Sequence, residues 1–155
     1  ASSKRRCCFA AARNGLREFW IVLTSPIERA YRLELNRGYW YVATPYTRYP
    51  DGWPAAYSDA MQAGLHLSRE GVANFVPVAY CHPLANAGLA KHDDGEFWQQ
   101  FLKPFMRAAQ GLIVVKMPGW RTSEGVTAEI DYFTKRNCKA FTMQWPIEPW
   151  AWRTD

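Results

Sequence analysis

The chain has 155 residues, of which 48% are apolar, 21% are charged and 15% are aromatic. This length and composition exclude an intrinsically disordered protein and suffice for one domain with a full hydrophobic core. No apolar run approaches the roughly 18 residues of a membrane-spanning helix, so we expect no span and no membrane partner.

The net charge of +5 is concentrated at the N-terminus. Residues 1–38 hold eight Lys and Arg against three Glu, whereas residues 39–155 hold eleven of each sign. We therefore divide the chain into a basic, poorly defined N-terminal extension, residues 1–38, and a domain, residues 39–155. The extension either contacts nucleic acid or anionic lipid, or is solvated and has no partner. A short helix is expected at residues 25–35, where Pro26 fits the first turn.

The four cysteines, Cys7, Cys8, Cys81 and Cys138, form no C-x-x-C pair. Adjacent Cys7 and Cys8 have poor geometry for a mutual disulfide. Free thiols are typical of a reducing compartment, and the apolar residues 19–23 lack a signal-peptide cleavage pattern. We therefore expect a cytoplasmic protein.

From residue 39 on, strands and helices alternate. Short aromatic and β-branched runs predict strands at residues 39–43, 74–79, 112–117 and 139–143. Helices are expected at residues 55–70, at 96–110 with a bend near Pro104, and around Glu129 up to about residue 136; residues 44–54 and 81–95 are expected to be loops. In the first helix, Met61 and Leu65 should face inward, with Ala60 or Leu67. The alternation predicts an α/β fold: a doubly wound parallel sheet of four to five strands in three α/β/α layers.

Glu129 stands out because it lies on the apolar face of its helix. Val126, Glu129, Ile130 and Phe133 follow the i, i+3, i+4, i+7 spacing of one helix face. A carboxylate on an inward face loses hydration and tends to be protonated or paired. Two interpretations remain open: a functional carboxylate, or a flanking Glu whose stem packs while its head reaches water.

Two segments that follow strands are expected to meet at one edge of the sheet. Residues 41–46, YVATPY, leave the first strand, and residues 118–129, PGWRTSEGVTAE, leave the third. Carboxyl ends of parallel strands share an edge, where open α/β sheets bind ligands. Ser123 can cap the helix and Gly125 keeps its first turn uncrowded, which favours a hydroxyl or phosphate there. A ligand anchored at this turn would present its next atoms to Glu129.

These two motifs carry a resemblance. Y-x-A-x-P-Y and P-G-W-x-x-S-x-G-x-x-x-E, in this order, resemble a bacterial and phage branch of unknown function in the nucleoside 2-deoxyribosyltransferase-like superfamily, over residues 39–143. The resemblance implies a flavodoxin-like sheet and an enzyme that cleaves or transfers the N-glycosidic bond of a small (deoxy)nucleoside or nucleoside monophosphate. It also implies a homodimer, and no cofactor or metal is expected. Three Trp in residues 145–152 should pack on the domain or on a partner subunit.

The resemblance also implies roles for individual residues. Glu129 would attack the anomeric carbon and form a glycosyl ester, and Tyr41 would hold that carboxylate in position. Ser123 and Gly125 would sit at the 5′ end of the sugar. The substrate-binding set is Ala43, Thr44, Pro45, Tyr46, Trp120, Ser123 and Gly125. Trp120 is expected to form a lid with Arg121, whose guanidinium pairs either with a phosphate or with solvent.

One expected group is absent from the pattern. Members often carry an Asp four residues after a Trp that aligns with Trp98, and this chain has Leu102 there. The acid that protonates the leaving base is therefore either supplied by Asp94 or its neighbour Asp93, or missing. If it is missing, the domain is either a non-catalytic nucleotide-binding or sensing module, or an enzyme for a substrate whose leaving group needs little help.

His82, His92 and the neighbouring aspartates are expected to have structural roles. His82 precedes a proline in a loop that borders the predicted crevice, and a structural histidine is favoured over a functional one. His92, Asp93 and Asp94 are consecutive and lack the spacing of metal ligands, which indicates a solvated loop.

Overall fold

A computed structural model describes residues 17–18 and 38–147 of the chain. The helix predicted at residues 25–35 and the last two tryptophans, Trp150 and Trp152, lie outside the described residues. Trp145 is described and packs against the hydrophobic core, as expected for the C-terminal Trp group. None of the helices in the described ranges combines the length and apolar character needed to cross a bilayer.

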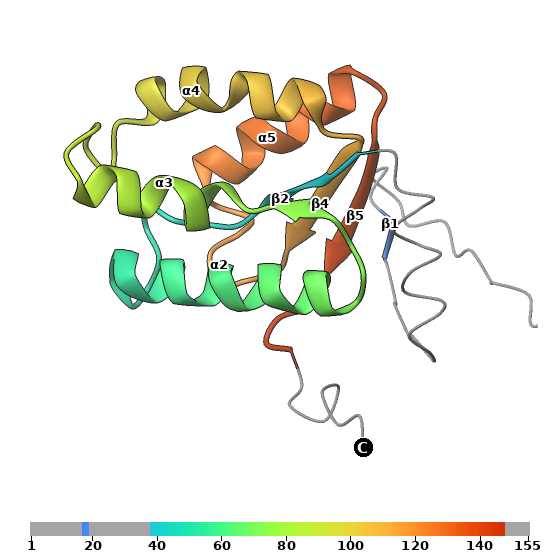
Figure 1. Cartoon of the computed structure of the whole chain (residues 1–155), viewed down its shortest axis with the longest axis horizontal. Helices are drawn as coiled ribbons and strands as arrows, with labels where there is room; N and C mark the ends of the chain where they lie inside the picture. The colour runs from blue at the N-terminus through green and yellow to red at the C-terminus, as the bar shows by residue number, and fades with distance from the viewer. Residues whose placement is uncertain (1–16, 19–37, 148–155) are drawn as a thin grey trace, which may run out of the picture.

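The sheet has five parallel strands in the order β1-β5-β4-β2-β3 (Figure 1). The strands are β1 (Arg17–Glu18), β2 (Trp40–Ala43), β3 (Asn74–Phe75), β4 (Gly111–Val115) and β5 (Lys139–Met143). From β2 the chain steps first to β3 on one side and then back to β4 and β5 on the other. This confirms the predicted doubly wound, flavodoxin-like order, and its reversal point lies between β2 and β4.

Helices cover both faces of the sheet and give the predicted three layers (Figure 1). They are α2 (Gly52–Arg69), α3 (Pro77–Asn86), α4 (Gly95–Ala108) and α5 (Glu124–Lys135). Alternate strand residues face opposite layers: Val42 and Ile113 pack in the core cluster that includes α2, while Tyr41 and Leu112 pack in the cluster that includes α4 and α5. Burial on both faces explains why β4 is a continuous apolar run.

The strand predicted at residues 74–79 is wrong beyond Phe75. Val76 is extended, with φ −105° and ψ 103°, and Pro77 begins α3. A residue before proline is driven towards extended backbone, whereas proline itself suits the first position of a helix. Residues 81–86, expected to be loop, therefore belong to a helix.

The predicted inward face of α2 is also wrong. Met61 and Leu65 are 45% and 41% exposed. The buried positions are instead Ala56, Ala60, Ala63, Gly64 and Leu67, so only the Ala60 and Leu67 alternatives are confirmed. A Cβ on Gly64 would lie 2.8 Å from a methyl carbon of the following segment, so the small residues let α2 approach closely.

The helices and strands around the predicted site begin close to where the sequence indicates. Ser123 caps α5, its hydroxyl accepting a hydrogen bond from the backbone of Val126 at 3.4 Å, which confirms the predicted cap. α4 begins after Asp94 and ends at Ala108, two residues before the predicted end, and Pro104 lies inside it. Gly111, which lies between the predicted helix and the predicted strand, is the first residue of β4.

Candidate functional site

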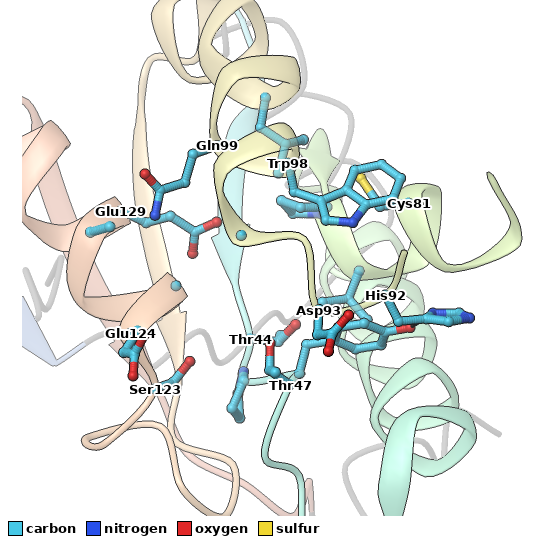
Figure 2. Close-up of a pocket in the computed structure, with 18 of the residues that line it drawn as sticks. Thr44, Thr47, Cys81, His92, Asp93, Trp98, Gln99, Ser123, Glu124 and Glu129 are labelled. Atoms are coloured by element: carbon cyan, nitrogen blue, oxygen red, sulfur yellow. Dashed lines mark hydrogen bonds between the residues drawn. The ribbon is translucent and has the colours of Figure 1, made fainter. Parts of the chain in front are cut away.

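A cavity of about 340 Å³ opens where β2 and β4 end (Figure 2). Its walls come from the segment after β2, from α3 and α4, and from the segment after β4 that leads into α5. This is the reversal point of the strand order, where doubly wound sheets bind ligands. The volume is at the lower end of the range for pockets that enclose small molecules.

Most of the predicted site residues line this cavity. They are Tyr41, Thr44, Pro45, Tyr46, Ser123, Gly125 and Glu129. Ala43, Trp120 and Asp94 are not among the lining residues. Ala43 is buried in the core between sheet and helices, and Trp120 packs against the same cluster with the Arg121 guanidinium 5.1 Å from its ring centroid.

The two candidate acid positions separate in the structure. Asp94 caps α4 by accepting a hydrogen bond from the backbone of Phe97 at 3.0 Å. Asp93 lines the cavity, on the side opposite Glu129 in Figure 2. Leu102, at the position of the acid that the resemblance implied, is 8% exposed and also lines the cavity.

The central polar contact joins β2 to α5. The Tyr41 hydroxyl donates to Glu129 Oε1 at 2.7 Å, across 88 residues of sequence. Tyr41 is fully buried, and Glu129 is exposed only in part and borders the cavity. Val126 and Phe133 on the same helix face are buried in the core. The carboxyl group is therefore held by a tyrosine at a cavity wall.

Burial dominates the electrostatics of this pair. Loss of hydration raises the pKa of Glu129 from 4.5 to about 8, although the hydrogen bond from Tyr41 lowers it in part. Burial, followed by the charge of Glu129, raises the pKa of Tyr41 well above 10. Tyr41 thus keeps its proton and remains the donor, and the Glu129 carboxyl group, with a pKa of about 8, is largely protonated at neutral pH.

A second polar group at the wall has no partner. Thr44 is 6% exposed, and its Oγ1 is buried without a hydrogen-bond partner among the described residues. It lines the cavity together with Ser123 and Gly125 of the α5 N-terminus. The first N–H groups of a helix lack partners within the helix and favour negative charge. The Thr44 hydroxyl is therefore available to form a hydrogen bond with a polar group that enters the cavity.

The mouth of the cavity carries an ion pair. Arg48 Nη2 and Glu124 Oε1 lie 3.4 Å apart, and their side chains are 84% and 86% exposed. Both residues line the cavity, so the pair connects the segment after β2 to the first turn of α5. An exposed pair of this kind contributes about 0–1 kcal/mol.

Sequence reasoning missed a cluster of rings on the cavity wall. The Tyr46 hydroxyl lies 2.6 Å from His82 Nδ1 and 2.6 Å from His92 Nδ1. Tyr57 stacks on His82 at 4.7 Å and Trp53 stacks on His92 at 4.4 Å between ring centroids. The i, i+4 spacing of His82 and Asn86 would have indicated a linked pair had residues 77–86 been predicted as a helix.

Other groups in the cavity have simpler roles. Burial, with the charge of Glu129, raises the pKa of the Cys81 thiol to about 12, so the thiol remains protonated and is a weak nucleophile. Within residues 17–18 and 38–147, no three His, Cys, Asp or Glu side chains are grouped to hold a metal ion.

The fold and the site together define an α/β domain of flavodoxin-like strand order with a ligand-sized cavity at its reversal point. The chain belongs to the family described as Domain of unknown function (DUF1937), which matches residues 38–145. No curated protein matches the sequence. The family description names no activity, so the geometry of the site is the evidence for the function.

Proposed function

We propose that the protein cleaves or transfers the N-glycosidic bond of a small (deoxy)nucleoside or nucleoside monophosphate, with Glu129 as the nucleophile. The observation that carries the proposal is the 2.7 Å hydrogen bond from Tyr41 to Glu129 at the wall of the cavity. A carboxylate that is oriented by a buried donor and shielded from water suits attack on an anomeric carbon.

The reaction follows from the charge that develops at the sugar. As the bond between C1′ and the base nitrogen lengthens, C1′ becomes positively charged, and the Glu129 carboxylate stabilises it and then bonds to it. Ionisation of Glu129 is costly because burial raises the pKa of its carboxyl group to about 8. The positive charge of the transition state offsets that cost, so the carboxylate binds this state better than the ground state. Water, or a second base, then resolves the ester.

The remaining wall supports a sugar with a polar 5′ end. Ser123, Gly125 and the unpartnered hydroxyl of Thr44 would receive the 5′ hydroxyl or phosphate at the α5 N-terminus. Arg48 at the mouth would approach a phosphate. Glu129 lies one turn further along α5, which is where the sugar ring would follow.

The direct test is a panel of deoxynucleosides and ribonucleosides with their 5′ monophosphates, each with and without an acceptor base. Free base or exchanged nucleoside is measured by chromatography. We expect release from at least one substrate, and loss of that release in Glu129→Gln. Asp131→Asn is the matched control, because Asp131 belongs to the same helix, is exposed and does not line the cavity. A panel with no release, or full activity in Glu129→Gln, would remove the proposal.

A second candidate function is a non-catalytic nucleotide-binding or sensing module. It is favoured by Leu102, which puts an apolar side chain on the cavity wall where a base-side acid was expected. This alternative predicts saturable binding of a nucleoside monophosphate in calorimetry and no base release over long incubation. The two measurements together separate the two functions.

We also propose a cytoplasmic homodimer. The resemblance supports the dimer, and the absence of a C-x-x-C pair together with the free, protonated thiol of Cys81 agrees with a reducing compartment. Light scattering of the full chain tests the dimer. Contact of residues 1–38 with nucleic acid stays a prediction, tested by salt-sensitive DNA binding that is lost when these residues are deleted.

A further inference from the structure

The Tyr46 hydroxyl is in contact with two imidazole nitrogens, and all three residues line the cavity. Both contacts are 2.6 Å long. A phenol has one proton to donate and two lone pairs that accept. Because the phenol has a single proton, at most one of the two nitrogens can accept from Tyr46, and at least one must donate to it when both imidazoles are neutral.

Asn86 decides which imidazole donates. Its Nδ2 lies 3.1 Å from His82 Nε2, and an amide nitrogen can only donate. His82 Nε2 is then the acceptor, so His82 carries its proton on Nδ1 and donates to Tyr46. Burial, with His92 as a further cause, lowers the pKa of His82, which agrees with a neutral ring. Tyr46 in turn donates to His92 Nδ1.

Protonation of His92 reverses the second of these hydrogen bonds. Protonated His92 donates from Nδ1, so the Tyr46 oxygen accepts from both rings and its own proton must turn to a third acceptor. Trp53 stacks on the His92 ring with 4.4 Å between ring centroids, which fixes the orientation of the imidazole. Asp93 and Cys81 are further titratable side chains that line the cavity.

We propose that Tyr46 and His92 form the proton relay that protonates the leaving base, in place of the acid absent at Leu102. The inference rests on the proposed function. Burial raises the pKa of Tyr46 to about 12, so the phenol alone is a poor proton source, but it can pass a proton on while receiving one. Figure 2 shows His92 and Asp93 on one side of the cavity and Glu129 on the other, which places base and sugar between them.

The proposed step breaks the glycosidic bond, forms one bond to Glu129 and moves two protons. The bond between C1′ and the base nitrogen breaks, and its electron pair stays with the base. The Tyr46 hydroxyl proton moves to the base, and the His92 Nδ1 proton moves to the Tyr46 oxygen. A Glu129 oxygen bonds to C1′. His92 ends neutral, Tyr46 ends unchanged, and His82 positions the phenol throughout.

The test compares pairs of substrates that differ only in their need for an acid. For a purine the pair is the nucleoside and its N7-methylated form, whose cationic base leaves without a proton. For a pyrimidine it is the nucleoside and its 5-fluorinated form, whose base leaves more readily as an anion. Base release is measured as kcat/KM for wild type, Tyr46→Phe and His92→Gln, with circular dichroism to confirm folding.

We expect Tyr46→Phe and His92→Gln each to lower kcat/KM for the unmodified substrate by roughly 10²–10⁴-fold and for the activated substrate by much less. Glu129→Gln should lose base release from both the unmodified and the activated substrate. Equal losses on both substrates, or no loss on either, would overturn the relay while leaving the nucleophile in place. A wild-type protein that releases neither base overturns the proposed function and the relay with it. His92→Gln keeps the test decisive if Tyr46→Phe does not fold, because His92 lies in the exposed segment between α3 and α4.

Discussion

Replacing Glu129 by Gln should stabilise the protein in a way that depends strongly on pH. The folded pKa of about 8 lies far above the ordinary value of 4.5. Between these two values the unfolded chain has lost the proton that the folded chain retains, so the free energy of unfolding falls as pH rises. The window spans about 3.5 pH units, and at 1.36 kcal/mol per unit the fall is at most roughly 5 kcal/mol. Gln carries no such proton, so the variant does not show this fall.

The assay is urea unfolding of both proteins at pH values from 4 to 9. All other titrating groups contribute to both proteins, so the difference in unfolding free energy isolates Glu129. That difference should grow from about pH 4.5 and level off above pH 8, by several kcal/mol. Glu124→Gln, at an exposed carboxylate of the same helix, should give a nearly constant difference. A constant difference for Glu129→Gln over pH 5–8 would show that the carboxyl group ionises normally and would refute the reasoning on a shielded nucleophile.

Two further substitutions test the site, and a third tests the packing of the sheet. Tyr41→Phe removes the hydrogen bond that lowers the pKa of Glu129, so the midpoint of kcat/KM against pH should move above about 8, with a lower limiting rate. Thr44→Val removes a buried hydroxyl without a partner, so urea unfolding should show a gain of about 1 kcal/mol while calorimetry shows weaker binding of a nucleoside monophosphate. Gly111→Ala should cost about 1–3 kcal/mol in urea unfolding, because the new Cβ would lie 2.6 Å from a backbone oxygen of β5. Gly95→Ala is its control, since no heavy atom lies within 4 Å of a Cβ there. A loss in Gly95→Ala equal to that in Gly111→Ala would count against the steric argument.

The sheet could be predicted because its strands are short, apolar and separated by clear breakers. Burial of both faces of β4 makes residues 111–115 a continuous apolar run, which indicates a buried strand. The edge of the site was also readable, because Ser123 is a helix cap and Glu129 interrupts an apolar helix face. Both signals depend only on residues within one segment, so they can be recognised in a single sequence.

What could not be predicted depends on contacts between distant segments. Residues 74–79 read as a strand from their apolar character, yet Pro77 begins a helix that places His82 on the cavity wall. The pairing of Tyr46 with His82 and with His92 spans 36 and 46 residues respectively, and no spacing rule links such positions. On α2, alanines face the sheet because the close approach of the helix excludes larger side chains, so hydrophobicity alone indicates the wrong face.

The ion pair between Arg48 and Glu124 has a consequence for how a charged molecule reaches the cavity. Both side chains retain most of their hydration, so parting them is cheap. An incoming anion can replace the Glu124 carboxylate as the partner of Arg48, so Arg48 keeps an anionic partner at the mouth of the cavity. Added salt screens both the Arg48–Glu124 ion pair and the charge of an incoming anion. The association rate of a phosphorylated ligand should therefore depend on ionic strength far more than the association rate of a neutral ligand.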